Sequence, residues 1–423
     1  MKIRSLTPAE SQRASGFIIE AMAGNRRNVQ KLQAYLRSHP SYKANRHIMA
    51  IDDDGSWLSH VLMEDRLSVR IENARVKTAL VSYVGTPPEY RNRGLASATM
   101  RAAAEWARKQ GYALIILSSA PGAAFHVYRK IGYARFCDEP HVTVSVADVH
   151  PLAQEKSPYR VRRFSPNDVP AAARLYRRTY QGVTGTIVRT PAYWRWALSA
   201  KADSPGPVNH RDPDIAFTAL KNGTPVAYAL GTTGTFHIPE GGACILWECA
   251  HAHGHISAYR AILGACARLM LKKRLHTLRV AAPTTHPVFL PLRERGGTLS
   301  MDVHRHDLAL VPDHQVFLNA LLPALERRIA CSRFGGRNLR LALAAAEKPL
   351  VLRSRNGNLA IAKGTCPDTF ACSAESMTQM LIGYRSAENL CDCEQATVTT
   401  ENARETAEVL FPELRPWQSH LDS

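Results

Sequence analysis

One stretch of the chain, residues 80–136, constrains the fold more than any other. It opens with an apolar, β-branched segment over 80–85 that is typical of a buried strand. Pro87 and Pro88 follow, and neither can extend a β-ladder because proline lacks a backbone N–H. A helix then begins near Gly94 and ends at Gly111, and a strand, a short helix and a further strand complete the stretch. The order predicts a mixed α/β sheet with helices packed against it.

The turn before this helix carries a pattern that favours anion binding. It reads Arg91-x-x-Gly94-x-Ala96 at a helix N-terminus, where the first N–H groups lack intrahelical partners and the helix dipole attracts negative charge. Gly94 lets an anion approach the backbone, Ala96 keeps the next turn thin, and Arg91 with Arg93 can add charge-assisted bonds. The pattern predicts a pyrophosphate site. The alternative is an ordinary loop with solvated arginines.

A second pattern follows at Tyr128-Arg-Lys-Ile-Gly132-Tyr133, where a short helix ends in a glycine turn. Taken alone, Tyr128 would be interpreted as a core residue of an amphipathic helix. The two patterns in this order resemble the GCN5-related N-acetyltransferases (GNAT). The hallmark of that family is V-x-x-x-x-R/Q-x-x-G-x-G/A followed by Y-x-x-x-G-F/Y.

The resemblance implies acetyl-CoA as the acyl donor and direct transfer of the acetyl group to an amine in a ternary complex. The main chain over 84–86 is expected to bind the pantetheine arm, and the turn with the start of the helix is expected to bind the pyrophosphate. Tyr128, with a reference pKa near 10, is expected to protonate the departing thiolate. The expected coenzyme-binding residues are Val84, Gly85, Thr86, Arg91, Asn92, Arg93, Gly94, Leu95, Ala96 and Ser97.

The chain has 423 residues and is too long for one such domain. The strand at 141–146 is expected to close the first domain, and the strand–turn–helix order restarts at Tyr159. This repeat lacks the phosphate pattern, since residues 250–255 read AHAHGH. We therefore expect a degenerate second copy with no coenzyme site. His251, His253 and His255 are spaced like metal ligands, but a loop or helix start is favoured and no metal is expected.

The last part, a helix and four strands ending in a helix before Gly383, resembles the sterol carrier protein fold. The three parts together resemble the Eis (enhanced intracellular survival) type of acetyltransferase. The predicted fold is α/β (α+β), with two tandem GNAT folds and a sterol-carrier-like α+β domain. The predicted domains cover residues 1–150, 151–312 and 313–423.

The Eis-type resemblance implies an aminoglycoside, polyamine or lysine-type acceptor, which could be a small molecule or a protein. It also implies a homo-oligomer, a hexamer or smaller, in which the tail walls the active site. The carboxylate of Ser423 is then expected to be the base. The aromatic last residue usual in the family is absent here, so Asp422 and water are alternatives.

Charge and composition limit the partners. The net charge is +18 at pH 7, which suits nucleic acid, an anionic membrane or an anionic ligand such as coenzyme A. We expect no nucleic-acid partner, because the sequence has no Lys/Arg-rich arm, no aromatic-plus-basic motif and no zinc finger. No apolar run is long enough to span a bilayer. The nine scattered cysteines indicate reduced thiols in a cytoplasmic protein.

Three functional hypotheses remain. The first is an acetyl-CoA-dependent amine N-acetyltransferase, and the second is an enzyme that transfers a longer acyl group. The third is a non-catalytic scaffold that binds acyl-CoA or lipid. The retention of Arg91, Gly94, Ala96 and Tyr128 favours an enzyme, because the degenerate second copy has lost these patterns.

Overall fold

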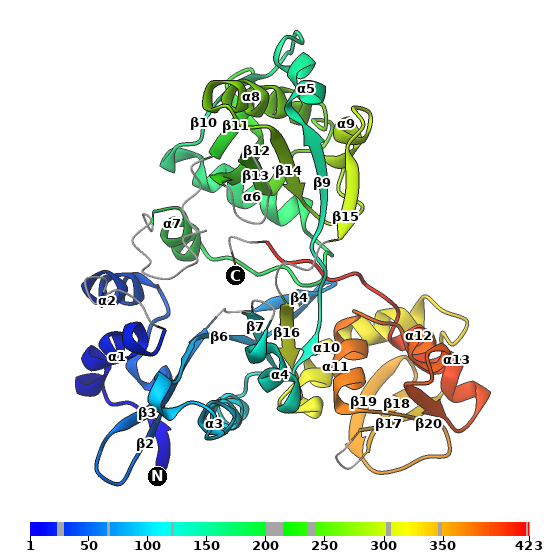
Figure 1. Cartoon of the computed structure of the whole chain (residues 1–423). Helices are drawn as coiled ribbons and strands as arrows, with labels where there is room; N and C mark the ends of the chain where they lie inside the picture. The colour runs from blue at the N-terminus through cyan, green and yellow to red at the C-terminus, as the bar shows by residue number, and fades with distance from the viewer. Residues whose placement is uncertain are drawn as a thin grey trace.

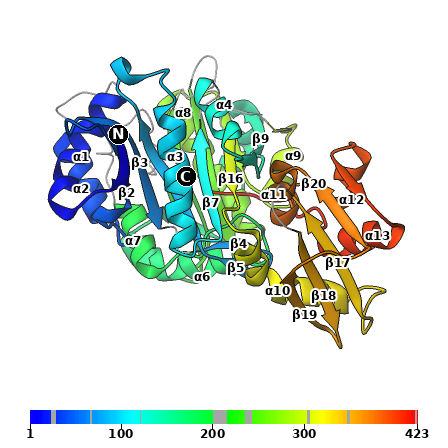
Figure 2. The ribbon, with the colours of Figure 1, turned by 90° about the horizontal axis from the view of Figure 1, so that it is seen from below.

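The computed structural model describes residues 1–22, 29–65, 68–119, 122–199, 215–234, 242–301, 306–345, 349–419 and 422. These residues form three lobes around three main sheets (Figure 1). Seen from a perpendicular direction, the third lobe, coloured orange to red, projects to one side of the other two (Figure 2).

The first sheet has the strand order β1-β2-β3-β6-β7-β16-β8. Its strands are β1 (Lys2–Ser5), β2 (His47–Ile51), β3 (Trp57–Asp65), β6 (Thr78–Gly85), β7 (Leu114–Ser119), β8 (Ala134–Arg135) and β16 (His306–Leu310). Only β6 and β7 run parallel among these pairs. The strand predicted over 80–85 is confirmed as part of β6.

Helices cover both faces of this sheet. One face packs on α1 (Pro8–Ala21) and α2 (Val29–Ser38), and the other packs on α3 (Leu95–Lys109) and α4 (Ala123–Lys130). Alternation along β3 explains this arrangement, because Leu62 joins the α1 and α2 cluster while Val61 and Met63 join the α3 and α4 cluster.

The second sheet repeats this order as β10-β11-β12-β13-β14-β9-β15. Its strands are β10 (Arg160–Arg163), β11 (Ile215–Lys221), β12 (Thr224–Gly234), β13 (Ala243–His251), β14 (Thr277–Ala281), β9 (Pro140–Ser145) and β15 (Thr298–Met301). Its main helices are α6 (Val169–Thr179), α7 (Pro191–Ser199), α8 (Ala258–Lys273) and α9 (Phe289–Arg293), with the short α5 (Val146–Val149) after β9.

The two sheets exchange a strand. The strand expected to close the first domain forms as β9, but it pairs with β14 and β15 in the second sheet. In its place β16 enters the first sheet between β7 and β8. The prediction that this strand closes the first domain was wrong, because an apolar pattern identifies a strand but not the sheet in which it pairs. The domain bounds 1–150, 151–312 and 313–423 stay a prediction.

The third lobe contains the sheet β19-β18-β17-β20-β21. Its strands are β17 (Leu339–Ala344), β18 (Leu350–Arg355), β19 (Asn358–Lys363), β20 (Thr369–Cys372) and β21 (Ala396–Val398). Its helices are α10 (His314–Ala330), α11 (Ala374–Ile382), α12 (Ala387–Asp392) and α13 (Glu401–Leu410). The helix ending at Gly383 is confirmed, and Gly383 has the left-handed conformation that stops it, with φ 79°.

Contacts between distant segments join the lobes. The parts of the chain built on the first and second sheets are called the first and the second unit. The hairpin of β4 (Val69–Ile71) and β5 (Ala74–Val76) meets the second unit, where the Arg70 N–H donates to the Thr186 carbonyl at 2.8 Å. A single hydrophobic cluster contains Ile116 of β7 together with Phe317 and Leu321 of α10. The three lobes therefore pack as one body.

Candidate active site

The strand β6 is distorted where it approaches the predicted coenzyme site. It pairs with β7 from Thr78–Leu114 to Leu80–Ile116, and beyond Leu80 the described residues of the two strands no longer pair. Its pairing with β3 shifts register between His60 and Leu62, and Tyr83 has φ 49°. Such bulges re-aim the main chain and are common next to active sites. The two strands therefore diverge beside Val84, the first residue of the predicted amide-binding segment.

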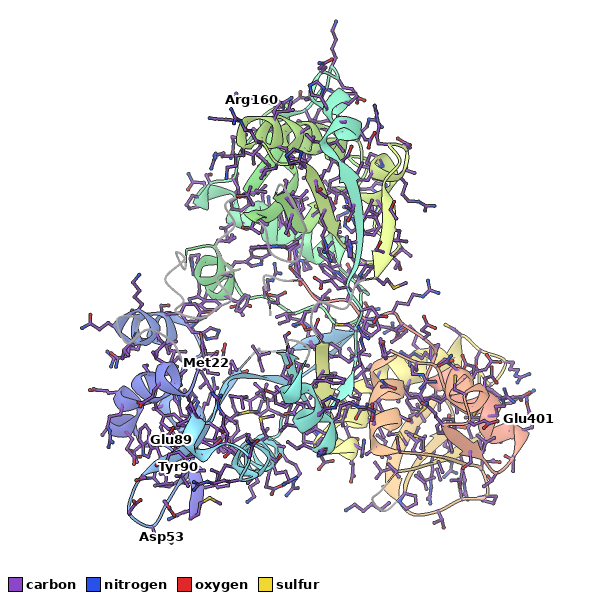
Figure 3. The ribbon with its side chains drawn as sticks, viewed as in Figure 1. Met22, Asp53, Glu89, Tyr90, Arg160 and Glu401 are labelled. Carbon is purple, nitrogen blue, oxygen red and sulfur yellow. The ribbon has the colours of Figure 1, made fainter. Side chains whose placement is uncertain are left out.

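The turn after β6 forms the predicted anion site. A 3₁₀ turn over Pro88–Tyr90 leads into Asn92 and Gly94, whose φ angles of 61° and 74° are both left-handed. Figure 3 labels Glu89 and Tyr90 on this turn, in the first lobe. Gly94 is the N-cap of α3, so no side chain can cover the helix end, and a Cβ there would meet no atom within 4 Å. Leu95, Ala96 and Ser97 supply the first N–H groups of α3 to this open space.

Arg91 has a role that the sequence did not predict. Its Nε donates to the Thr86 carbonyl at 3.0 Å, and its Nη2 donates to the Ala21 carbonyl at 3.1 Å. The guanidinium therefore ties the turn to the end of β6 and to the C-terminus of α1. Arg93 lies with its guanidinium carbon 5.6 Å from the ring centroid of Tyr90.

The amide-binding segment is held on both sides. Gly85 faces α1, and a Cβ on it would lie 2.8 Å from the Cβ of Ala21. The Thr86 hydroxyl donates to the Ser59 hydroxyl at 3.0 Å. Glycine at 85 thus permits the close approach of α1, and the structure brings 84–86 and 91–97 together at one end of the sheet.

Tyr128 lies on α4 with 8% of its surface exposed. It shares a hydrophobic cluster with Val81 of β6, and Val84 packs against that cluster. Its ring meets the ring of Tyr133 edge to face, with centroids 6.0 Å apart. Burial raises the pKa of Tyr128 to about 12, so its phenol is protonated at neutral pH. Tyr128 is both a packed core residue and a proton-bearing group beside the diverging strands.

Two residues near the end of the chain are candidates for the base. Ser423, the predicted base, lies outside the described residues. Asp422 is described, and its carboxylate binds the Arg189 Nε at 2.9 Å and Nη2 at 2.8 Å. Arg189 also binds Glu248 at 2.9 Å, and the side chains of all three are fully buried. Asp422 is therefore engaged as an ion-pair partner.

In the second unit the corresponding space is filled by aromatic rings. Strands β13 and β14 run parallel as far as Leu246–Val280. Beyond that point the Tyr180 hydroxyl donates to the Cys249 carbonyl at 2.8 Å, and the Tyr180 ring stacks on Trp417 with centroids 5.0 Å apart. The His286 ring also stacks on the Tyr180 ring, with centroids 5.8 Å apart. Among the described residues, aromatic rings therefore pack where β13 and β14 stop pairing, and the phosphate pattern is lacking there.

The histidines over 251–255 have ordinary partners. His251 Nδ1 lies 3.0 Å from the Tyr259 hydroxyl, and His255 Nδ1 lies 3.2 Å from the Tyr159 hydroxyl. Across the described ranges no group of three or more metal-ligating side chains gathers in one place. Within the same ranges, no helix is long and apolar enough to cross a membrane.

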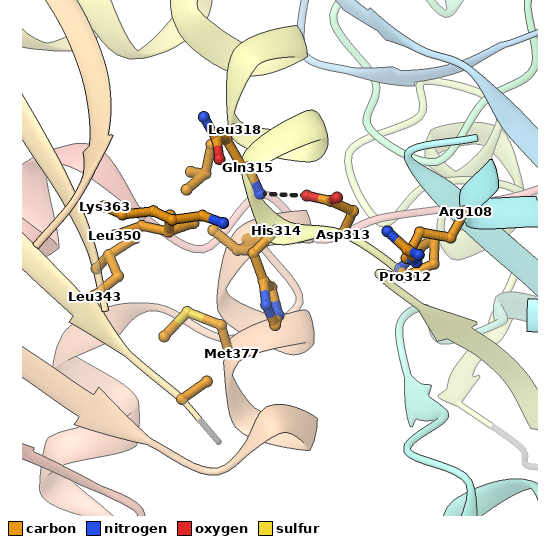
Figure 4. A pocket seen from close by; sticks show the side chains of 12 residues that line it. Arg108, Pro312, Asp313, His314, Gln315, Leu318, Leu343, Leu350, Lys363 and Met377 are labelled. Atoms are coloured by element: carbon orange, nitrogen blue, oxygen red, sulfur yellow. Dashed lines mark hydrogen bonds between the residues drawn. The ribbon is translucent and has the colours of Figure 1, made fainter. Parts of the chain in front are cut away.

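A cavity of about 440 Å³ lies elsewhere, between α10, α11 and the strands β17 to β19 (Figure 4). Asp313 at its rim caps α10 by accepting from the Gln315 N–H at 3.0 Å. Arg108, also at the rim, is near the C-terminal end of α3. Because α3 rises about 1.5 Å per residue, Arg108 lies roughly 20 Å along the helix from Gly94, and none of the residues that line the cavity belongs to the coenzyme turn.

Sequence reasoning missed the residues that support the bulge. His60 Nδ1 lies 2.9 Å from the Tyr83 carbonyl, and His47 lies 2.8 Å from His60. A histidine at an inward position of each of two neighbouring strands was the available signal. It could not be interpreted without knowing how β2, β3 and β6 align.

Comparison with known proteins agrees with this geometry. Residues 2–136 match the sequence model of the acetyltransferase (GNAT) domain. The matched part contains β6, the turn at Gly94 and Tyr128, and domains of the GNAT family transfer an acyl group from acyl-CoA to an amine. No curated protein sequence matches the chain.

Solved structures resemble the whole chain. A GCN5-related N-acetyltransferase from Anabaena variabilis has a TM-score of 0.73 at 14% identity, covering 99% of this chain and 98% of that one. A probable N-acyltransferase from Enterococcus faecalis has a TM-score of 0.71 at 17% identity, with coverage of 99% and 98%. Eis1 from Mycobacterium abscessus has a TM-score of 0.65 at 16% identity, with coverage of 99% of both chains.

The TM-scores show a shared fold, and at identities this low the likeness shows the fold alone. The predicted fold class, with tandem GNAT folds built on mixed sheets, is confirmed. The sterol-carrier-like assignment of residues 313–423 stays a prediction.

Proposed function

We propose that the chain is an acetyl-CoA-dependent N-acetyltransferase that transfers the acetyl group directly to an amine in a ternary complex. The observation that carries the proposal is the bulged end of β6, which leads into the left-handed turn at Gly94 and lies beside a buried, protonated Tyr128.

The donor binds along the end of β6 and the start of α3. The pyrophosphate sits on the N–H groups at the α3 N-terminus, where the helix dipole favours an anion, and Arg93 adds positive charge. The pantetheine arm lies against the main chain of Val84, Gly85 and Thr86. Main-chain donors at this point polarise the acetyl carbonyl and stabilise the oxyanion that forms during attack.

The reaction forms a C–N bond and breaks the thioester C–S bond. The amine nitrogen attacks the carbonyl carbon, and the electron pair of the broken bond leaves on sulfur. Tyr128 gives its phenolic proton to that thiolate, because burial keeps the phenol protonated at neutral pH and so available as a general acid. The proton lost by the amine goes to a base, for which the Ser423 carboxylate stays a prediction. Asp422 is a poor alternative, since Arg189 already holds its carboxylate.

The acceptor belongs to the aminoglycoside, polyamine or lysine-type amines, either as a small molecule or on a protein. The likeness of the whole chain to Eis1 supports this range. We also propose a homo-oligomer.

Only the first unit binds the coenzyme, because aromatic rings fill the matching space in the second unit.

The test is the amine-dependent release of coenzyme A thiol, measured with a panel of these acceptors and with acetyl and longer acyl donors. We expect Tyr128→Phe to lower kcat by about 10²-fold with little change in the KM for acetyl-CoA, because a general acid contributes about that much. Tyr133→Phe is the matched control, because Tyr133 lies in the same cluster and its buried hydroxyl has no hydrogen-bond partner among the described residues. A Tyr128→Phe enzyme that keeps the wild-type kcat would contradict the assigned role.

A further inference from the structure

A hydrogen-bonded chain of side chains ends on the bulge of β6. The Tyr42 hydroxyl lies 3.1 Å from His47 Nε2, and His47 Nδ1 lies 2.8 Å from His60 Nε2. His60 Nδ1 then lies 2.9 Å from the carbonyl oxygen of Tyr83. Both histidines are fully buried, whereas Tyr42 is partly exposed. This series of hydrogen bonds therefore runs from near the surface to Tyr83, the residue that precedes Val84.

The direction of every bond in this chain is fixed by chemistry. A carbonyl oxygen can only accept, so His60 Nδ1 carries the proton. Burial lowers the pKa of His60 to about 4, so His60 is neutral at pH 7 and its Nε2 accepts. His47 Nδ1 must then donate to it. Burial, followed by the nearby His60, lowers the pKa of His47 to about 3, so its Nε2 accepts from the Tyr42 hydroxyl.

The carbonyl at the end of the chain belongs to an unfavourable backbone conformation. Tyr83 has φ 49°, a left-handed angle that is costly for any residue except glycine. The register of β3 against β6 shifts at this point, and the Tyr83 carbonyl accepts from a side chain. His60 also belongs to β3, the strand whose register shifts. The bond thus ties the two strands together across their irregularity.

We propose that His60 is a positioning residue for acyl transfer, and that His47 and Tyr42 hold it in the donating tautomer. By fixing the Tyr83 peptide, His60 sets the direction of the main chain over 84–86 toward the thioester. The inference rests on the proposed function, since that function gives the bulged end of β6 its role in binding the acyl donor. His60 does not touch the reacting atoms, so it acts only through the geometry of the bulge.

Two substitutions at His60 separate positioning from packing. His60→Leu removes the donor, whereas His60→Asn keeps an amide N–H in place of Nδ1–H. We expect His60→Leu to lower kcat by about 10- to 100-fold, because small misplacements at a reacting centre have effects of that order. His60→Asn should recover most of this loss. The affinity for coenzyme A, which lacks the acetyl carbonyl, should change little in both, because the turn at Gly94 is untouched. Met49→Leu is the control, a volume-conserving change at a fully buried site on β2.

A binding measurement separates this inference from the proposed function. His60→Leu should lower the affinity for acetyl-CoA relative to that for coenzyme A, because only the former presents a carbonyl to the bulge. If wild-type protein binds acetyl-CoA but acetylates no amine, the proposed function fails and this affinity ratio still tests His60. Unchanged kcat and affinity ratio in folded His60→Leu would overturn the inference. Should that variant not fold, Tyr42→Phe takes its place, and a fall in kcat of about threefold is expected there, since one neutral hydrogen bond is lost. An unchanged kcat in Tyr42→Phe would overturn it.

Discussion

At the scale of single residues, two glycines serve the site for different reasons. Gly94 needs its left-handed φ of 74° and leaves open space at the start of α3. Gly85 has no such angle, but a side chain on it would strike Ala21 of α1. The hallmark pattern explains the first glycine, whereas the second is required by a contact between segments more than sixty residues apart.

This difference gives a prediction for Gly85→Ala. The added Cβ would lie 2.8 Å from that of Ala21, so α1 or β6 must shift. We expect the free energy of unfolding to fall by about 1–3 kcal/mol, as for other overpacked cores. Urea unfolding with two spectroscopic probes measures the change.

Gly16→Ala supplies the matched control, because Gly16 lies inside α1 and a Cβ there would meet no atom within 4 Å. It should stabilise the protein by about 0.5–1 kcal/mol through the better helix propensity of alanine. Equal effects from the two substitutions would show that the contact at Gly85 is not tight.

At the scale of elements, those set by residues near in sequence could be predicted, whereas those set by distant residues could not. The strand, turn and helix around Gly94 and the helix of Tyr128 could be predicted, because their turn and cap residues are close in sequence. The bulge at Tyr83, the contacts of Arg91 and the pairing of β9 could not. The bulge contacts His60, and Arg91 contacts the Ala21 carbonyl. The place of β9 in the first sheet is taken by β16, which lies more than 150 residues further along the chain.

The exchange of strands predicts long-range damage from Ala309→Pro. Ala309 of β16 pairs with Ile116 of β7 and Ala134 of β8, and proline would remove a ladder bond and clash inside the sheet. We expect a loss of about 3 kcal/mol or more in unfolding free energy, together with weaker binding of acetyl-CoA by the first unit.

Leu299→Pro on β15 is the comparison, because β15 is an edge strand of the second sheet and, among the described strands, pairs with β9 alone. It should leave acetyl-CoA binding close to wild type. If Ala309→Pro binds acetyl-CoA as tightly as Leu299→Pro does, β16 is not an integral strand of the coenzyme-binding sheet.

At the scale of the whole molecule, the last segment of the chain links the lobes. It leaves the third lobe after Phe411 and runs to the second unit, where the Trp417 N–H donates to the Thr184 carbonyl at 2.8 Å (Figure 1). Asp422 then joins Arg189 and Glu248 in a fully buried cluster. The guanidinium carbon of Arg189 also lies 4.1 Å from the ring centroid of Tyr176 and 4.5 Å from that of Trp194. A buried cluster of this kind so near the end of the chain fixes the segment in place.

We therefore predict that Arg189→Met destabilises the protein strongly. Two carboxylates would lose their buried cation, and removing one partner of a buried pair typically costs about 3–5 kcal/mol. Asp422→Asn should cost less, because it keeps polar contacts to Arg189 and leaves one ion pair with Glu248. Thermal unfolding of both variants gives the comparison, and a harmless Arg189→Met would show that the cluster does not anchor the segment.

The central claim is that a single working coenzyme site lies at the Gly94 turn, and calorimetric titration with acetyl-CoA tests it most directly. We predict about one site per chain in the wild-type protein. We also predict no binding in Gly94→Asp, because the new carboxylate would repel the pyrophosphate and strain a left-handed residue. Two sites per chain would contradict the claim, and so would unaltered binding by a folded Gly94→Asp variant.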